Sequence, residues 1–106
     1  MSEADSIPQL GQVVRITKGR DVGKYAVVIK IINDRFVLLA DGDKRKYDRP
    51  KKKNLHHIAP MDYISLEIKN SLQETGRVTN GKLRFTVDKF KDEVVNDFKK
   101  GVQLDG

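Results

Sequence analysis

The chain of 106 residues contains no cysteine, and it has no long apolar run. The absence of cysteine excludes disulfides, thiolate nucleophiles and zinc sites built on cysteine ligands. No apolar stretch approaches the roughly 20 residues that a membrane-spanning helix needs, so we expect no contact with a membrane. The acidic and polar start, residues 1–6, lacks the basic and apolar regions of a secretory signal. These features predict a cytoplasmic protein.

The short length also limits what the protein can enclose. Folding of a chain of this size hides only about 60–70% of the surface of the unfolded chain, so the core is small and a deep catalytic cleft is difficult to build. Hydrophobic residues make up 38% and charged residues 34% of the sequence, which is typical of a folded globular domain. We therefore expect a single compact domain, or a small domain with an appendage.

The positive charge of the chain is unevenly distributed. Residues 1–61 contain 13 of the 21 lysines and arginines and 7 of the 15 acidic residues, whereas residues 62–106 contain eight of each. The formal net charge of +6 is therefore carried entirely by the first segment. Such an asymmetry indicates a surface for a polyanion on one part of the molecule, since solubility alone does not require it.

The first 60 residues show short strands separated by turns. Runs of β-branched and other apolar residues predict strands at 12–17, 25–32 and 35–40, and a last short strand is expected at 54–58. Glycine, asparagine and aspartate between these runs are typical of turns. Four or five short strands on close turns indicate a small antiparallel barrel, which we place at residues 7–60.

The apolar spacing beyond Pro60 changes to that of helices. Asp62 is the expected cap of a short helix that ends at Gly76. A second amphipathic helix is predicted by five apolar residues spaced three or four apart, with a turn or cap at 79–81 and a stop at Gly101. These are Leu83, Val87, Phe90, Val94 and Phe98. The fold class is thus mostly β with a C-terminal α extension, residues 61–106, which either covers the barrel or binds a partner.

A dense basic segment at residues 44–53 is the strongest functional signal. Seven of its ten residues are positively charged, and such a density of like charge favours binding of phosphates over folding stability. Arginine can bind a phosphate or a guanine edge through two hydrogen bonds, and Tyr47 is a candidate for stacking on an unpaired base. The alternatives are a solvated loop that keeps the protein soluble and a Tyr47 that belongs to the core. The candidate RNA-binding residues here are Lys44, Arg45, Lys46, Tyr47, Arg49, Lys51, Lys52 and Lys53.

A glycine turn at residues 18–24 is the second signal. Gly19 and Gly23 allow the backbone to approach a phosphate closely, with Lys18, Arg20 and Lys24 around it. A tight turn that happens to be flanked by lysines is an equally good interpretation of these residues alone. It is not a nucleotide-binding P-loop, because Gly23-Lys24 is followed by tyrosine instead of serine or threonine.

Candidate residues for metal binding or catalysis do not form a pattern. His56 and His57 are adjacent, and on a strand they would point to opposite faces, so they do not converge on a metal. The serines and acids are scattered without the local signatures of a hydrolase. We therefore predict that the protein is not an enzyme and has no metal, cofactor or small-molecule substrate.

The segment from Gly11 through the glycine turn to Ile29 resembles the KOW motif, a strand, a glycine-bearing turn and a second strand found in ribosomal proteins and transcription-elongation factors. Residues 34–42 resemble the next strand of KOW-bearing large-subunit ribosomal proteins of archaea and eukaryotes. Over roughly residues 8–86 the chain is similar to short KOW-domain RNA-binding proteins of Gram-positive bacteria. The resemblance implies an SH3-like barrel and a contact loop at Lys18, Gly19, Arg20, Gly23 and Lys24.

Together these observations predict a ribosome-associated protein that binds RNA, with ribosomal RNA as the expected target and ribosomal proteins as further partners. The basic segment and the glycine turn would make the contacts. A second hypothesis is a protein-interaction module for RNA polymerase or a ribosomal protein, which does not need the basic segment. A third is a small enzyme that acts on RNA, which requires one acid or histidine whose loss stops turnover without preventing binding.

Overall fold

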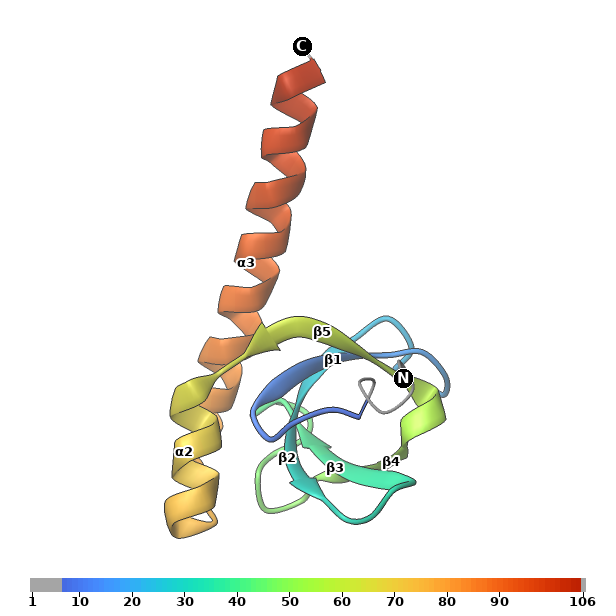
Figure 1. Cartoon of the computed structure of the whole chain (residues 1–106), viewed down its shortest axis with the longest axis vertical. Helices are drawn as coiled ribbons and strands as arrows, with labels where there is room; N and C mark the ends of the chain where they lie inside the picture. Colours follow the sequence, from blue (N-terminus) through green and yellow to red (C-terminus); the bar gives the residue numbers. More distant parts are fainter. Residues whose placement is uncertain (1–6, 106) are drawn as a thin grey trace.

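The computed structural model describes residues 7–105, with side-chain surroundings given through residue 94. Five strands come first, and two helices follow them (Figure 1). The strands are β1 (Gln12–Ile16), β2 (Tyr25–Ile31), β3 (Phe36–Ala40), β4 (Lys51–Asn54) and β5 (Ile58–Ile64). A 3-10 turn, η1 (Leu55–His57), joins β4 to β5, and the helices are α2 (Leu66–Thr75) and α3 (Asn80–Asp105).

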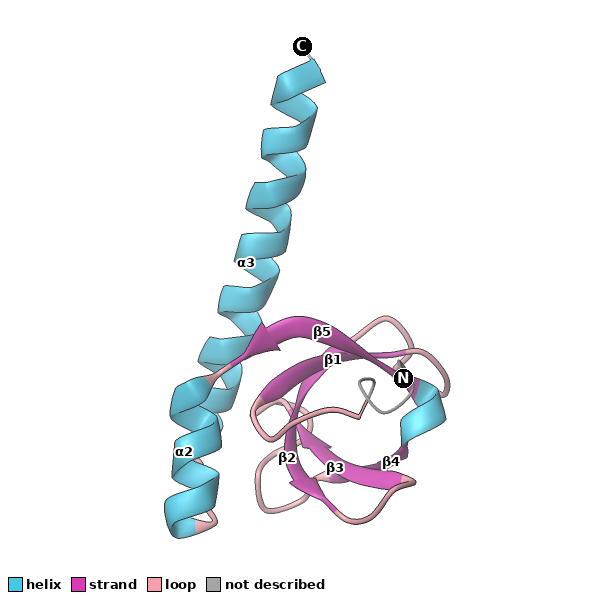
Figure 2. Ribbon diagram, viewed as in Figure 1, coloured by secondary structure: helices cyan, strands magenta, loops and turns pink. Residues whose placement is uncertain are grey.

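The strands form one antiparallel sheet in the order β4-β3-β2-β1-β5, which curls into a small barrel (Figure 2). The pairing of β1 with β2 places Val14 opposite Ala26, and β1 also pairs with β5 on its other side. The register shifts within β2, between Val28 and Lys30, and within β1, between Gln12 and Val14. Such irregularities increase the local bend of a strand, which lets a five-stranded sheet curl.

Both faces of the central strands are buried. Val14 and Val28 point into the barrel, where they pack with residues of β3 and β5, whereas Val13 and Val27 point outward and pack against the helices. All four side chains are completely buried. Because side chains alternate between the faces of a strand, a sheet covered on both sides needs apolar residues at consecutive positions. This explains the almost continuous apolar run in β2.

The helices lie together on one side of the barrel and complete its outer core (Figures 1 and 2). Ile68 and Leu72 of α2 and Leu83 and Val87 of α3 are buried in the same cluster as Val27. α2 and the first part of α3, as far as Phe90, therefore pack on the barrel, and the rest of α3 extends beyond it (Figure 1). A Lys82–Glu67 ion pair of 2.8 Å also joins α3 to α2.

Three aromatic rings hold α3 against the sheet. Phe90 meets the rings of Tyr25 and Tyr63 edge-on, with ring centroids 5.0 and 5.7 Å apart, a favoured geometry for aromatic pairs. Burial, and in second place the carboxylate of Glu93, raise the pKa of Tyr63 above its usual value of 10.0. These contacts fix the position of Tyr25 at the start of β2.

Several predicted boundaries are wrong. The strand expected at 54–58 is largely the η1 turn, because the side chain of Asn54 accepts a hydrogen bond from the amide of His56 and caps it. His56 and His57 therefore lie in a turn, not on opposite faces of a strand. The strand that follows runs to Ile64, beyond the expected end of the barrel at residue 60.

The helix ends also differ in part from the prediction. Asp62 belongs to β5, and the cap of α2 is Ser65, whose hydroxyl accepts a hydrogen bond from the amide of Ile68. Gly76 ends α2 in a left-handed conformation, as expected. α3 continues through Gly101 to Asp105, so that glycine is not a stop. Of the five residues of the predicted stripe, Leu83, Val87 and Phe90 are buried and Val94 is 45% exposed, whereas the side chain of Phe98 lies outside the described residues.

Candidate nucleic-acid interface

The glycine turn, residues 18–24, projects from the barrel between β1 and β2. The amide of Gly23 donates to the carbonyl of Ile16 at 2.7 Å, and the amide of Ile16 donates to the carbonyl of Lys24 at 2.8 Å, which closes the turn at its base. Gly19 and Gly23 have φ values of 100° and 89°, a region that glycine adopts without strain. The side chains of Lys18, Arg20 and Lys24 are exposed around it.

The basic segment, residues 44–53, consists of a loop followed by a strand. The loop starts from a turn built on Asp41, whose carboxylate accepts hydrogen bonds from the amides of Asp43 and Arg45 at 2.8 and 2.9 Å. The amides of Asp41 and Gly42 in turn donate to the carbonyl of Arg45. Local bonds of this kind are what aspartate contributes to turns. They fix the point at which the basic side chains begin.

The same loop is fastened to the start of α3. Gly42 has a φ of 80° and lies so close to the helix that a Cβ there would overlap the carbonyl oxygen of Asn80. The Arg84 guanidinium donates to the Gly42 carbonyl at 2.7 Å, and the side chain of Asn80 accepts from the amide of Tyr47 at 2.7 Å. The loop is thus held in a defined place by α3, although its basic side chains are exposed to solvent.

Tyr47 packs against the core, as the alternative interpretation of this residue expected, and it makes one further contact. Its ring is partly buried against the outer core, and its hydroxyl donates to the carbonyl of Gly76 at 2.7 Å. The side chain therefore links the basic loop to the end of α2. Stacking of Tyr47 on a base stays a prediction, and it has to be compatible with this contact.

The lysines of β4 do not share one face. Lys51, Lys52 and Lys53 pair with Leu39, Leu38 and Val37 of β3, so their side chains alternate between the two faces of the strand. The ammonium group of Lys52 lies 4.5 Å from the centroid of the Phe36 ring, a cation–π contact. The Nζ atom of Lys53 instead lies at the glycine turn, 2.8 Å from where a Cβ on Gly19 would be.

The glycine turn and the basic segment meet at Asp21. Its carboxylate lies 3.7 Å from the Lys24 ammonium and 3.9 Å from the Arg45 guanidinium. A small depression of about 20 Å³ beside it is also lined by Lys44 and Lys51. We call the five cations at this junction the basic face. Lys24, Lys44, Arg45 and Lys51 lie beside Asp21, and Lys53 lies at Gly19 of the same turn. Two segments distant in sequence are thus combined in one surface.

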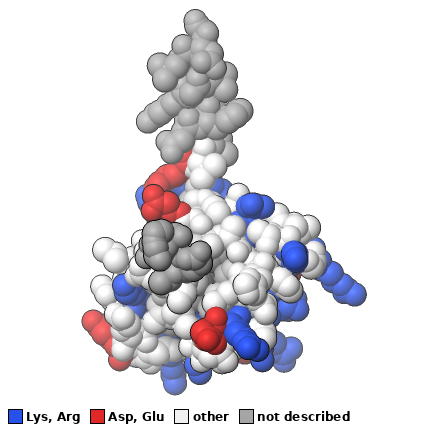
Figure 3. Space-filling view, turned by 45° about the vertical axis from the view of Figure 1, so that its right-hand side comes forward, with Lys and Arg blue, Asp and Glu red and all other residues white. Residues whose placement is uncertain are grey.

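The other predicted basic residues lie outside the basic face. Lys18 and Arg20 are exposed at the tip of the glycine turn, and Lys46 and Arg49 are exposed in the loop, where the amide of Arg49 donates to the carbonyl of Lys46. Figure 3 shows basic side chains spread over the lower and right-hand parts of the barrel, with isolated acidic groups between them. The structure therefore does not gather all thirteen candidate residues at one point.

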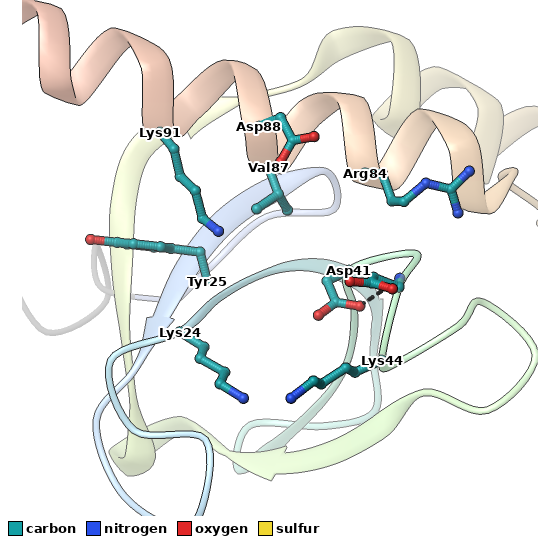
Figure 4. Close-up of a pocket in the computed structure, with 9 residues that line it drawn as sticks. Lys24, Tyr25, Asp41, Lys44, Arg84, Val87, Asp88 and Lys91 are labelled. Atoms are coloured by element: carbon teal, nitrogen blue, oxygen red, sulfur yellow. Dashed lines mark hydrogen bonds between the residues drawn. The ribbon is translucent and has the colours of Figure 1, made fainter.

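Sequence reasoning missed three residues beside the basic face. The first is Asp21. An acid inside a basic turn is a natural partner for the cations around it, and this is the signal that could have identified it. Arg84 and Lys91 of α3 line a groove together with Lys24 and Lys44 (Figure 4). Their spacing of seven residues places them on the same face of a helix, a signal that the sequence does contain.

Among the residues that the structure describes, no three histidine, cysteine, aspartate or glutamate side chains are grouped in a way that could hold a metal ion. None of the helices in this part of the chain is long and apolar enough to cross a membrane.

A five-stranded barrel with a glycine turn between its first two strands is the arrangement of a KOW-motif protein. Comparison with protein families agrees, since the family model "KOW motif" matches residues 10–39, which include the glycine turn.

Similarity to named proteins covers more of the chain than the KOW motif does. The chain is 42% identical over 71 residues to the Bacillus subtilis protein called "Putative ribosome-binding protein YbzG", which covers 67% of this chain and 96% of YbzG. It is 26% identical over 76 residues to large ribosomal subunit protein eL14 of Sulfolobus acidocaldarius, covering 64% of this chain and 79% of that protein. Identity to eL14 of Pyrobaculum calidifontis is 31% over 65 residues, covering 61% and 62% of the two chains. The chain belongs to the family of small KOW-motif proteins that includes YbzG, as the resemblance of the sequence had indicated.

Proposed function

We propose that this protein is a ribosome-associated factor without enzymatic activity that binds ribosomal RNA through its basic face. The observation that carries the proposal is the meeting of the glycine turn and the basic segment, which brings five cations together, two of them within 4 Å of the Asp21 carboxylate. Backbone phosphates are the ligands that such a surface attracts, because each neutralised phosphate releases condensed counterions. The designations of YbzG and eL14 support the ribosome as the place of binding.

The mechanism is electrostatic docking on a preformed surface. The loop is already fixed by its bonds to α3, and the glycine turn is closed by two backbone hydrogen bonds, so little conformational freedom has to be lost on binding. If the five cations of the basic face meet single-stranded phosphates, the logarithm of the affinity falls against the logarithm of salt concentration with a slope of about −3.5.

A protein-interaction module is the alternative, with a ribosomal protein or RNA polymerase as partner. It is favoured by the exposed apolar residues of the helices, since Leu66 is 67% and Phe85 63% exposed. Such a module would use the helical side of the molecule and not the basic face. The two functions therefore predict different effects of the same substitutions.

Sedimentation of the tagged protein in a lysate gradient tests the proposal. We expect it to migrate with the large subunit or the whole ribosome at low salt, and to be released at high salt. The triple variant Lys51→Glu, Lys52→Glu, Lys53→Glu, which reverses two cations of the basic face and their neighbour Lys52, should stay at the top of the gradient. A matched variant with the same change in charge, Lys30→Glu, Arg35→Glu, Lys89→Glu, replaces exposed cations outside the basic face and should still migrate with ribosomes.

The outcomes separate the two functions. If both triple variants failed to migrate with ribosomes, or if both still did, docking by the basic face would be contradicted. If the Lys51–Lys53 variant still migrated with ribosomes and bound purified ribosomal RNA no more weakly than the unaltered protein, the protein-interaction module would be the better account.

A further inference from the structure

A groove lies between α3 and the loops of the barrel, beside the basic face. It has a volume of about 310 Å³, within the lower range of small-ligand pockets. Nine residues line it, from the glycine turn, the start of β2, the Asp41 turn and α3 (Figure 4). They are Lys24, Tyr25, Asp41, Asp43, Lys44, Arg84, Val87, Asp88 and Lys91. We call it the helix groove.

Two lysines of the groove lining face each other. In Figure 4 the side chains of Lys24 and Lys44 extend from opposite sides with their ammonium groups directed toward one another. The ammonium group of Lys24 lies 3.7 Å from the Asp21 carboxylate, whereas the ammonium group of Lys44 has no carboxylate within 4 Å among the described residues. Two converging cations repel each other, and an anion between them removes that repulsion.

Part of the groove lining is aromatic and apolar. Tyr25 and Val87 form it, and the ring of Tyr25 is held by its edge-on contact with Phe90. Lys91 reaches from α3 toward this ring (Figure 4). A fixed aromatic ring beside lysines is the combination on which bases stack in single-stranded nucleic-acid sites.

The acids of the groove are compatible with a nucleotide. One oxygen of Asp41 is already used by the amides of Asp43 and Arg45, so this carboxylate stabilises the turn. Asp43 and Asp88 remain as acceptors, and carboxylates accept hydrogen bonds from amino groups on base edges. The groove thus offers two lysines for a phosphate, and an aromatic ring with two carboxylates for a base. These groups match the two ends of one nucleotide.

We propose that the helix groove receives one unpaired nucleotide of the bound RNA, with its phosphate between Lys24 and Lys44 and its base against Tyr25. This inference rests on the proposed RNA binding and adds a preference to it. A base in a duplex is paired and stacked within the helix, so it does not enter the groove, whereas a base in a loop, bulge or end does. The protein therefore prefers single-stranded to double-stranded RNA.

The test compares a fluorescent 12-nucleotide single-stranded RNA with a duplex of the same sequence, by anisotropy. Lys91 reaches toward the Tyr25 ring, so its cation lies beside a base stacked there and not beside a duplex that stays outside the groove. We therefore expect Lys91→Ala to weaken binding of the single strand about tenfold and binding of the duplex less than about twofold. Lys89→Ala is the matched control, since it removes the same charge from an exposed position of α3 that does not line the groove. It should change neither affinity by more than about twofold.

A second measurement does not depend on any variant. Ultraviolet crosslinking of a thiouridine-substituted single strand to the unaltered protein, followed by mass spectrometry, should give a crosslinked peptide that contains Tyr25. Crosslinks confined to residues 45–53, none of which lines the groove, or equal effects of Lys91→Ala and Lys89→Ala, would overturn the helix groove as a nucleotide site while leaving RNA binding by the basic face intact.

Two other results complete the test. If the unaltered protein bound neither RNA, the proposed function itself would fail. If adenosine monophosphate competed with the single strand at equal concentration, the groove would be a site for a free nucleotide, and the inference about RNA would be wrong.

Discussion

The close approach of Gly42 to α3 gives a prediction whose size follows from the structure. Replacement by alanine forces a side chain into a backbone with φ of 80° and makes its Cβ overlap the carbonyl oxygen of Asn80. That oxygen belongs to the first turn of α3 and cannot move aside like the end of a flexible side chain. The loop must therefore leave the helix.

The expected loss of stability has two parts. A non-glycine residue at positive φ costs about 1 kcal/mol. Withdrawal of the loop also breaks the bonds from Arg84 to Gly42 and from Tyr47 to Asn80, each worth about 1 kcal/mol. The free energy of unfolding should fall by roughly 3 kcal/mol, which lowers the melting temperature of a domain of this size by roughly 12–24 °C.

Gly23→Ala is the matched control for thermal unfolding followed by circular dichroism. Gly23 has a φ of 89°, but a Cβ there would have no neighbour within 4 Å. Only the backbone cost applies, so the melting temperature should fall by roughly 4–8 °C. If the two variants melted at the same temperature, the loop would not be held by α3, and the preformed surface assumed for RNA binding would lose its support.

Two further predictions concern residues at the interface. Asp21→Asn should strengthen binding to RNA about two- to fivefold at low salt, because it removes the negative charge among the five cations. The free energy of unfolding should change by less than about 1 kcal/mol. Weaker binding in the anisotropy assay would mean that the carboxylate positions Lys24 and Arg45. Tyr47→Phe removes the hydrogen bond to Gly76 and should lower the free energy of unfolding, measured in urea, by about 1 kcal/mol. RNA affinity should not change, since the ring is kept. Unchanged stability would show that the hydroxyl does not hold the loop.

The central strands and the fold class could be predicted because their signal is local. The apolar runs of β1, β2 and β3 are bounded by glycines and turn residues, and the structure has strands there. β4 could not be predicted in this way, since three consecutive lysines are not typical of a strand. They form one because pairing with β3 outweighs intrinsic preference.

The candidate site was predictable in its residue types but not in its geometry. The density of charge identified the basic segment, and the glycines identified the turn. Their meeting at Asp21 depends on contacts between residues more than twenty positions apart, such as Arg45 with Asp21. The attachment of the loop to α3 likewise depends on Asn80 and Arg84, whose side-chain partners no local pattern reveals.

The position of β4 at one end of the sheet has a consequence for self-association. An end strand presents backbone groups to which a strand of another molecule can add, and lysines on such a strand oppose this addition. We therefore expect the lysines for which we propose a role in RNA binding to oppose self-association as well. Neutral apolar replacements at Lys51–Lys53 would expose this edge and favour aggregation, whereas glutamates keep it charged. Purified Lys51–Lys53 glutamate variants should accordingly stay monodisperse at concentrations at which the corresponding valine variants form oligomers.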